Sequence, residues 1–199
     1  SRVKRKNFIK IKKNKSLYKF FLEKVLKCNF DRIFVDTDSI EIMNFCKKRK
    51  INIIKRKKSL AQDNANGNDL LNYHAKIIKS DLYFQLFITA PLLSVETINK
   101  CIYLLKTKRK FDSIFTCHKI FSWFWFNDRP INYKPKILPR SQDAKPIVME
   151  TTGLYGIRKK TLEKHKCRIG QKPYFFEVSK KESLDLDTKE DFKILKTYL

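Results

Sequence analysis

Long apolar runs are missing from this sequence of 199 residues. The apolar stretches are short and are interrupted by Lys, Asn or Ser, whereas a membrane-spanning helix needs about 20 consecutive apolar residues. The basic residues 1–15 are followed by no apolar core and no small-residue cleavage site, so they do not resemble a secretory signal. We therefore expect a protein that stays out of the membrane and works in the cytoplasm.

Cysteines and histidines at metal-binding spacing are also missing. The five cysteines are scattered, odd in number and free of any CxxC motif, and the three histidines share no metal or triad spacing. The sequence therefore indicates neither a zinc site nor a disulfide framework, and we expect reduced cysteines used as small apolar residues. The residues concerned are Cys28, Cys46, Cys101, Cys117, Cys167, His74, His118 and His165.

Acidic residues are scarce, with 20 Asp and Glu against 45 Lys and Arg and a net charge of +25. Such a surplus is typical of nucleic-acid-binding proteins. Lys outnumbers Arg 35 to 10, however, and the lysines are spread from Lys4 to Lys196 without forming one basic block. Because Arg is better suited than Lys to bidentate phosphate contacts, nucleic-acid binding is the alternative function rather than the leading one. The charge would still attract substrates that carry several negative charges.

Short β-branched and aromatic segments alternate with amphipathic segments along most of the chain. Strands are predicted at 32–35, 51–54, 82–88, 113–117, 154–157 and 174–178. Ser16, Ser39 and Ser94 each precede a helical pattern and are predicted to be its N-cap. The alternation is typical of βαβ units, so we predict one α/β domain over residues 1–199. Its sheet should be mostly parallel, with helices on both faces, in the Rossmann-like manner.

Residues 121–146 break this alternation. They begin with the aromatic run Phe121–Phe126 and continue with Pro130, Pro135 and Pro139. We interpret them as a short inserted segment of the domain. Its aromatic side chains could stack on a sugar, but buried packing or a contact between subunits is the simpler interpretation.

Two aspartates near the C-terminus are candidates for a metal site. Asp185 and Asp187 are two residues apart, so in extended backbone they would lie on one face with Cα atoms about 6–7 Å apart. Hard carboxylate oxygens suit Mg²⁺, which keeps water ligands and bridges to substrate phosphates. Their spacing alone favours a simpler alternative, in which they are solvated or cap the last helix. That helix has a capping-box pattern at Thr188 and Asp191.

Several polar residues stand where ligands bind in α/β proteins. Asp36–Asp38 and Thr89–Pro91 follow predicted strands, and ligands of open parallel sheets bind beyond the carboxyl ends of strands. The basic start of the chain suits polyphosphate, or is only a solvated surface. Arg140 could grip a carboxylate through two parallel hydrogen bonds, or could lie free in solvent.

These segments form an ordered series of short motifs. They are Lys6-Asn7, Asp36–Ser39, Arg56 with Leu60–Asp63, Phe87–Leu92, Pro139–Gln142, Thr152–Tyr155 and Ser183–Asp187. In this order they resemble the acylneuraminate cytidylyltransferase family, whose members make CMP-linked sugar acids. The resemblance covers nearly the whole chain and implies the fold of nucleotide-diphospho-sugar transferases.

The resemblance implies a role for each matching residue. The residues implied to bind the nucleotide are Arg2, Lys6, Asn7, Asp38, Arg56 and Asp63. The residues implied to contact the sugar acid are Thr89, Arg140, Gln142 and Thr152. Asp185 and Asp187 are implied to bind magnesium, and together with Lys6 they would be the catalytic residues.

The implied reaction is attack of the sugar acid's anomeric hydroxyl on the α-phosphorus of CTP, which expels pyrophosphate. Such catalysis depends mainly on positioning and on neutralisation of charge by the metal and by cationic side chains. The resemblance further implies a homodimer formed through residues 121–146. A relative that binds nucleotide sugars without catalysis is a further alternative.

Three departures from the family pattern stand out. The sequence begins inside the nucleotide loop, so we expect the native protein to carry a preceding strand and the first half of that loop. Phe87 stands where the family usually has Gln, and Thr152 stands where it has Asn. The last two concern the sugar side, so sialic, legionaminic, pseudaminic and eight-carbon ulosonic acids all stay open as substrates.

Overall fold

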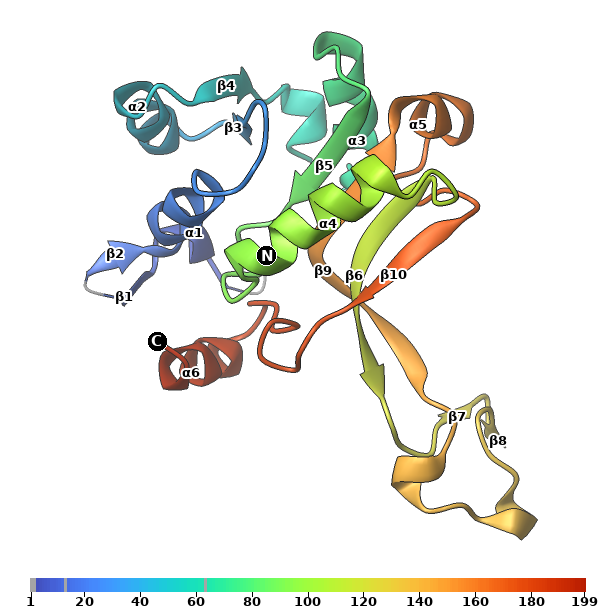
Figure 1. The fold of residues 1–199 in the computed structure, drawn as a ribbon. Helices are drawn as coiled ribbons and strands as arrows, with labels where there is room; N and C mark the ends of the chain where they lie inside the picture. The colour runs from blue at the N-terminus through green and yellow to red at the C-terminus, as the bar shows by residue number, and fades with distance from the viewer. Residues whose placement is uncertain (1–2, 13, 63) are drawn as a thin grey trace.

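The computed structural model describes residues 3–12, 14–62 and 64–199. Its largest sheet has the strand order β10-β6-β9-β5 (Figure 1). The strands are β5 (Leu82–Leu86), β6 (Ser113–Ile120), β9 (Ile147–Arg158) and β10 (Pro173–Glu177). β10 is parallel to β6, and β9 is antiparallel to both β6 and β5, so every strand of this sheet except β9 points the same way. The predicted α/β fold with a mostly parallel sheet is confirmed.

A separate parallel pair forms from the first part of the chain. β3 (Phe34–Thr37) and β4 (Asn52–Lys55) are connected by helix α2 (Ile40–Lys48) in a βαβ unit. The smaller elements are β1 (Lys10–Lys12), β2 (Lys15–Ser16), η1 (Lys6–Phe8), η2 (Lys58–Leu60), η3 (Pro135–Ile137) and η4 (Ser141–Asp143). The remaining helices are α1 (Leu17–Val25), α3 (Gly67–Ile77), α4 (Val95–Thr107), α5 (Lys159–His165) and α6 (Lys189–Thr197).

Helices cover both faces of the large sheet, because alternate residues of a strand point to opposite sides. On one face Leu82 and Phe84 of β5 pack with Ile98 and other residues of α4. On the other face Tyr83 packs with Leu71 of α3 and with α5. Within the described part of the chain, no helix is both long and apolar enough to cross a membrane.

The helix caps follow the sequence prediction in part. Ser94 and Ser39 accept hydrogen bonds from the backbone of Thr97 and Ile42, as predicted. Ser16 occupies the N-cap position of α1, but its side chain makes no capping hydrogen bond. The predicted capping box of α6 is present at Thr188 and Asp191.

The cysteines are free thiols and most of them belong to the apolar core. Cys28, Cys46, Cys101 and Cys117 are buried, and Cys167 is partly buried. The burial of the first four confirms that they serve as small apolar residues of the core. Burial raises the pKa of the thiols of Cys46 and Cys101, so they stay protonated.

The aromatic inserted segment forms a lobe at the end of a ribbon. β6 and β9 pair beyond the sheet from Cys117↔Glu150 to Ile120↔Ile147, and the ribbon carries residues 121–146 away from the helices (Figure 1). The lobe contains the short strands β7 (Trp125–Phe126) and β8 (Arg129–Pro130). The sequence predicted only 154–157 of β9, because residues 147–153 mix apolar and polar side chains without a regular period and pair with a distant strand.

Candidate active site

Three segments that are far apart in the sequence meet at the carboxyl end of β5. Lys6 Nζ donates to the backbone oxygen of Leu186 at 3.0 Å and to Asp187 Oδ1 at 2.9 Å. Leu186 N donates to Thr89 O at 2.9 Å, and the Leu186 side chain is fully buried. The N-terminal loop, the end of β5 and the segment before α6 are therefore held together by direct contacts.

The two candidate metal ligands lie in different surroundings. Asp187 is 52% exposed and pairs with Lys6. Asp185 has its Oδ1 atom buried without a hydrogen-bond partner. A buried carboxylate oxygen without a partner is costly, so its position requires a further explanation. Capping does not supply one, because Thr188 and Asp191 form the cap of α6.

Magnesium fits the residues present. Among the described residues, no group of three or more His, Cys, Asp and Glu side chains gathers as a metal site, so a closed zinc site is not indicated there. Mg²⁺ needs fewer protein ligands, since it commonly binds one or two carboxylates and completes its shell with water and substrate phosphates. The partnerless Oδ1 of Asp185 is the kind of hard oxygen that such an ion takes.

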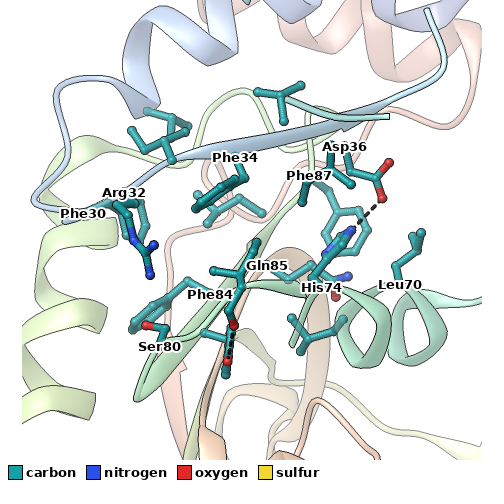
Figure 2. Close-up of a pocket in the computed structure, with 18 of the residues that line it drawn as sticks. Phe30, Arg32, Phe34, Asp36, Leu70, His74, Ser80, Phe84, Gln85 and Phe87 are labelled. Carbon is teal, nitrogen blue, oxygen red and sulfur yellow. Dashed lines mark hydrogen bonds and ion pairs between the residues drawn. The ribbon is translucent and has the colours of Figure 1, made fainter. Parts of the chain in front are cut away.

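A second polar cluster lies at the end of β3. Asp36 accepts a hydrogen bond from Arg56 Nε at 3.0 Å, and His74 Nε2 lies 2.6 Å from its other carboxylate oxygen (Figure 2). Burial alone would raise the pKa of Asp36, but the hydrogen bonds from His74 and Arg56 outweigh it and lower that pKa. Arg56 is thereby fixed at the strand end. The sequence prediction missed His74, because only the fold brings α3 beside β3.

A cleft of about 1500 Å³ connects these two clusters. It runs between β3 and β5, with side chains of both strands directed into it (Figure 2). Predicted nucleotide and substrate residues that line it are Lys6, Asn7, Asp38, Arg56 and Thr89. Arg2 and Asp63, which were predicted to join them, lie outside the described residues.

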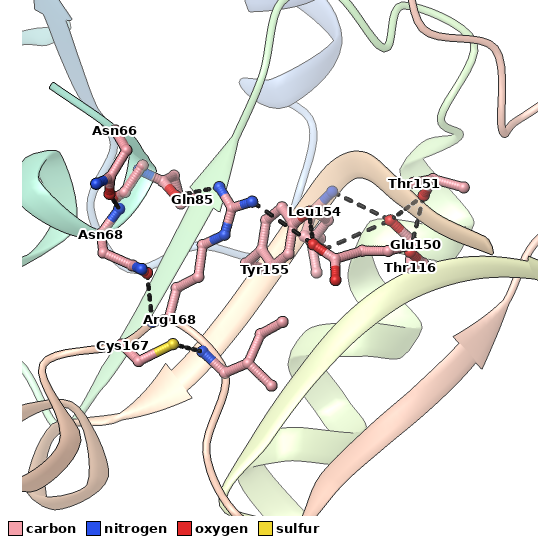
Figure 3. Close-up of polar contacts among 12 residues, drawn as sticks. Asn66, Asn68, Gln85, Thr116, Glu150, Thr151, Leu154, Tyr155, Cys167 and Arg168 are labelled. Atoms are coloured by element: carbon pink, nitrogen blue, oxygen red, sulfur yellow. Dashed lines mark hydrogen bonds and ion pairs between the residues drawn. The ribbon is translucent and has the colours of Figure 1, made fainter. Parts of the chain in front are cut away.

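A third cluster is centred on Arg168, which the sequence prediction missed. The guanidinium carbon lies 3.6 Å from the ring centre of Tyr155, and its nitrogens lie 3.5 Å from Gln85 Oε1 and 3.6 Å from Glu150 Oε1 (Figure 3). The Tyr155 hydroxyl donates to Glu150. Burial, followed by that hydrogen bond, raises the pKa of Tyr155. Because Arg168 stands alone in an irregular segment, no sequence pattern marks it.

Phe87 and Thr152 are the two residues that depart from the family pattern on the sugar side. Phe87 lies beside Arg168, and Thr152 lies on β9, the strand that carries Tyr155. The ring of Phe87 makes an edge contact with Tyr155 and lies 5.7 Å from the Arg168 guanidinium. Thr152 lies on β9 and has a buried hydroxyl without a hydrogen-bond partner. The Phe87 departure therefore lies beside a cation, the Arg168 guanidinium, to which a substrate carboxylate could bind.

Arg140 and Gln142 are not brought to these clusters within one chain. Both lie in the projecting lobe, where Arg140 is 76% exposed and pairs with Asp143 at 2.6 Å. The lobe points away from the end of β5 and from α6 (Figure 1). Within one chain the ribbon keeps these two residues apart from the other predicted substrate residues, and their contact with the sugar acid stays a prediction.

The sequence matches one family and several curated proteins. The cytidylyltransferase family model matches residues 1–197. The N-acylneuraminate cytidylyltransferase of Streptococcus agalactiae serotype V is 23% identical over 184 residues, which cover 82% of this chain and 42% of that protein. The Helicobacter pylori protein named pseudaminic acid cytidylyltransferase and UDP-2,4-diacetamido-2,4,6-trideoxy-beta-L-altropyranose hydrolase is 24% identical. That match covers 97% of this chain and 39% of that protein. The chain thus spans roughly two fifths of the length of these relatives.

Solved structures share the fold. CMP:2-keto-3-deoxy-manno-octonic acid synthetase complexed with CTP superposes with a TM-score of 0.70 and 15% identity, covering 100% of this chain and 92% of that one. The 4-diphosphocytidyl-2C-methyl-D-erythritol synthase of Anaerococcus prevotii gives a TM-score of 0.69 and 16% identity, covering 94% and 86%. At these identities the likeness concerns the fold alone.

Proposed function

This chain belongs to the cytidylyltransferase family, and from this premise we propose that it transfers the cytidylyl group of CTP to a sugar acid. The anomeric hydroxyl oxygen forms the new bond to the α-phosphorus, and the bond from that phosphorus to pyrophosphate breaks. The observation that carries the proposal is the meeting of Lys6, Thr89 and Asp187 at the end of β5. A cation and a carboxylate lie in contact there, and nucleotidyl transfer needs cations that neutralise the phosphates and carboxylates that can hold a metal ion.

The nucleotide side of the reaction depends on residues that line the cleft. Lys6 would release Asp187 in part and contact the triphosphate, with Asn7 beside it. Arg56, held by Asp36, would contact the nucleotide from the end of β3. Asp185 and Asp187 would hold Mg²⁺, which when bound neutralises phosphate charge and orients the leaving pyrophosphate.

The sugar side of the reaction needs a cation that can recognise a carboxylate. Arg168 is held flat against Tyr155 beside Phe87 and is only 21% exposed, so its guanidinium is fixed before a substrate arrives. A fixed guanidinium suits bidentate binding of a carboxylate. The curated relatives are named for N-acylneuraminate and pseudaminic acid, which supports a sugar acid as the acceptor.

A homodimer would give the lobe a role. Its exposed aromatic and aliphatic side chains are typical of a surface that binds another protein. They include Trp125, Phe126, Ile131, Ile137 and Leu138. Pairing of two copies through the lobe would let Arg140 and Gln142 of one chain reach the sugar-binding side of the other. We place the enzyme in the cytoplasm, where free thiols such as these stay reduced.

The direct test is release of pyrophosphate by the protein at its full natural length. CTP, ATP, GTP and UTP are each supplied with Mg²⁺ and with one sugar acid: N-acetylneuraminate, legionaminate, pseudaminate or an eight-carbon ulosonate. We expect release with CTP and with at least one acid, and little with the other nucleotides. No release with any acid, together with strongly salt-dependent binding to mixed DNA or RNA, would instead support a nucleic-acid-binding protein.

A further inference from the structure

The turn between β5 and α4 is largely buried, although it belongs to neither element. Ala90, Pro91, Leu92 and Leu93 of this turn all have buried side chains. Backbone carbonyl groups in such a segment need hydrogen-bond donors from elsewhere in the molecule. Lys24 of α1 supplies two of these bonds, because its Nζ atom donates to the backbone oxygen of Pro91 and, at 2.9 Å, to that of Leu93. The end of α1 is therefore attached to the turn that follows β5.

Lys24 has an apolar setting that is costly for a charged group. Its side chain is partly buried, and its Nζ atom lies 5.2 Å from the ring centre of Phe20. Burial lowers the pKa of Lys24 to about 8, and the nearby Cys28 and Glu182 oppose this shift only in part. A lysine side chain keeps N–H groups for both carbonyls whether it is charged or neutral. The contacts with the turn thus offset the cost of placing an amine here.

The same turn contacts the segment that carries the candidate metal ligands. Thr89 O accepts a hydrogen bond from Leu186 N at 2.9 Å, and Leu186 is the residue between the two aspartates. At the other end of the turn, Glu182 Oε1 accepts from Ser94 N at 2.9 Å. The segment before α6 is therefore bound to both ends of the turn whose middle Lys24 contacts.

Apolar packing connects the same parts of the chain. Leu17 of α1, Leu92 of the turn and Leu186 belong to one cluster with Phe192 of α6. In Figure 1 the start of α4 accordingly lies between α1 and α6. Helix α1 thus contacts the turn at two places, through the Leu17 cluster at its start and through Lys24 near its end. Replacing Lys24 by an apolar residue would remove only the polar contact.

We propose that Lys24 is a positioning residue for the candidate metal site. It holds the turn against α1, the turn holds Leu186 through Thr89 O, and Leu186 places the backbone of Asp185 and Asp187. The identity of the ion rests on the proposed function, whereas the contacts that lead from Lys24 to Leu186 do not. Without the lysine, the carbonyls of the turn would need water as a partner, and the bond from Leu186 to Thr89 would open more often.

Hydrogen exchange of backbone amides, measured without any metal ion, tests these contacts. The proteins compared are the wild type, Lys24→Met and the matched control Lys27→Met, each at its full natural length. Met keeps an apolar side chain and removes the donor, and Lys27 is at an exposed position just beyond α1. The Leu186 amide should exchange about tenfold faster or more in Lys24→Met and at the wild-type rate in Lys27→Met. The amide of Phe115, in β6, should exchange at the same rate in all three.

Two results of the exchange experiment would overturn the proposal. One is an unchanged rate for the Leu186 amide in Lys24→Met. The other is equal acceleration at Leu186 and Phe115, which would mean that the substitution lowers the stability of the whole fold and nothing more. Should Lys24→Met fail to fold, Lys24→Gln, which keeps an amide donor for one carbonyl, takes its place with the same expectations.

Binding of Mn²⁺ in place of Mg²⁺ tests the link to the metal site. Electron paramagnetic resonance follows the binding at millimolar concentrations without nucleotide. Lys24→Met should bind the ion more weakly than the wild type by about tenfold or more, and Lys27→Met should bind it as the wild type does. Equal binding by the wild type and Lys24→Met would overturn the role of Lys24 alone. No binding by the wild type would overturn the metal site of the proposed function together with that role.

Discussion

Asp36 lies between two basic side chains, and its carboxylate side chain is only 9% exposed. The contacts from Arg56 and His74 lower the pKa of Asp36. The ionised carboxylate is therefore more stable in the folded protein than in the unfolded chain. The resulting stabilisation is complete above the ordinary pKa near 3.8 and is lost as the pH falls through the lower pKa of the folded state.

We therefore expect Asp36→Asn to lower the free energy of unfolding by roughly 2 kcal/mol at pH 7. The difference between wild type and variant should shrink as the pH falls below about 4, because Asp36 is progressively protonated and its side chain becomes neutral like that of Asn. Urea unfolding at a series of pH values measures this. A difference that stays constant from pH 7 to the acid limit would contradict the assigned ion pair.

Arg168 gives a prediction about substrate affinity. Replacing it with Met keeps the apolar part of the side chain over Tyr155 but removes the charge. If Arg168 binds the acid carboxylate, Arg168→Met should raise KM for the sugar acid by about tenfold or more, and should leave KM for CTP nearly unchanged. Lys172→Met, at an exposed position close to Arg168 in the sequence, is the control. Equal effects on both KM values would indicate a structural role only.

The elements of the fold are stabilised by local and by distant contacts, and α4 shows both. Ser94 Oγ accepts from Thr97 N at 3.1 Å, while Glu182 accepts from Ser94 N and from the Thr97 hydroxyl. The carboxylate thus lies at the N-terminus of the helix, where negative charge is favourable. The cap could be predicted from the sequence, but Glu182 could not, because it reaches α4 from the segment that leads to α6.

Loss of the Ser94 cap should be measurable. Ser94→Ala should lower the free energy of unfolding by about 1 kcal/mol, because the amide of Thr97 loses its acceptor. Ser94→Thr retains a hydroxyl and should recover most of the loss. Chemical denaturation of the three proteins measures the effect, and equal stability of Ser94→Ala and the wild type would show that the cap contributes nothing.

The difference between local and distant contacts explains how much of the fold and of the site could be predicted from the sequence. Helices and strands with a regular apolar period, such as α4 and β5, follow from the sequence because their pattern is local. The full length of β9 does not, since its first half has no regular apolar period and is a strand only through pairing with β6. His74 and Arg168 could not be predicted as site residues, because only the fold brings them to Asp36 and Tyr155. Arg140 was matched by motif, and only the ribbon shows how far the lobe carries it from the cleft.

At the scale of the whole molecule, the proposed homodimer depends on the apolar side chains of the lobe. Trp125 is 58% exposed and Phe126 is 67% exposed, which is unusual for side chains of this size. Light scattering should give the mass of two chains for the wild type, and the mass of one for the double change Trp125→Ser and Phe126→Ser. Tyr103→Ser is the control, because Tyr103 is 63% exposed on α4 and lies outside the lobe. A single-chain mass for the wild type would contradict pairing through the lobe.

In the proposed reaction, the buried and partnerless Oδ1 of Asp185 binds the Mg²⁺ on which activity depends. The most direct measurement is the Mg²⁺-dependent formation of a CMP-sugar acid from CTP, followed by phosphorus NMR in wild type, Asp185→Asn and Glu190→Gln. Glu190 is an exposed carboxylate of α6 and serves as the matched control. We expect product from the wild type and from Glu190→Gln, and a rate lower by on the order of 10²-fold or more in Asp185→Asn. Product formed at the wild-type rate by Asp185→Asn, or no CMP-sugar from the wild type with any acid, would contradict the account.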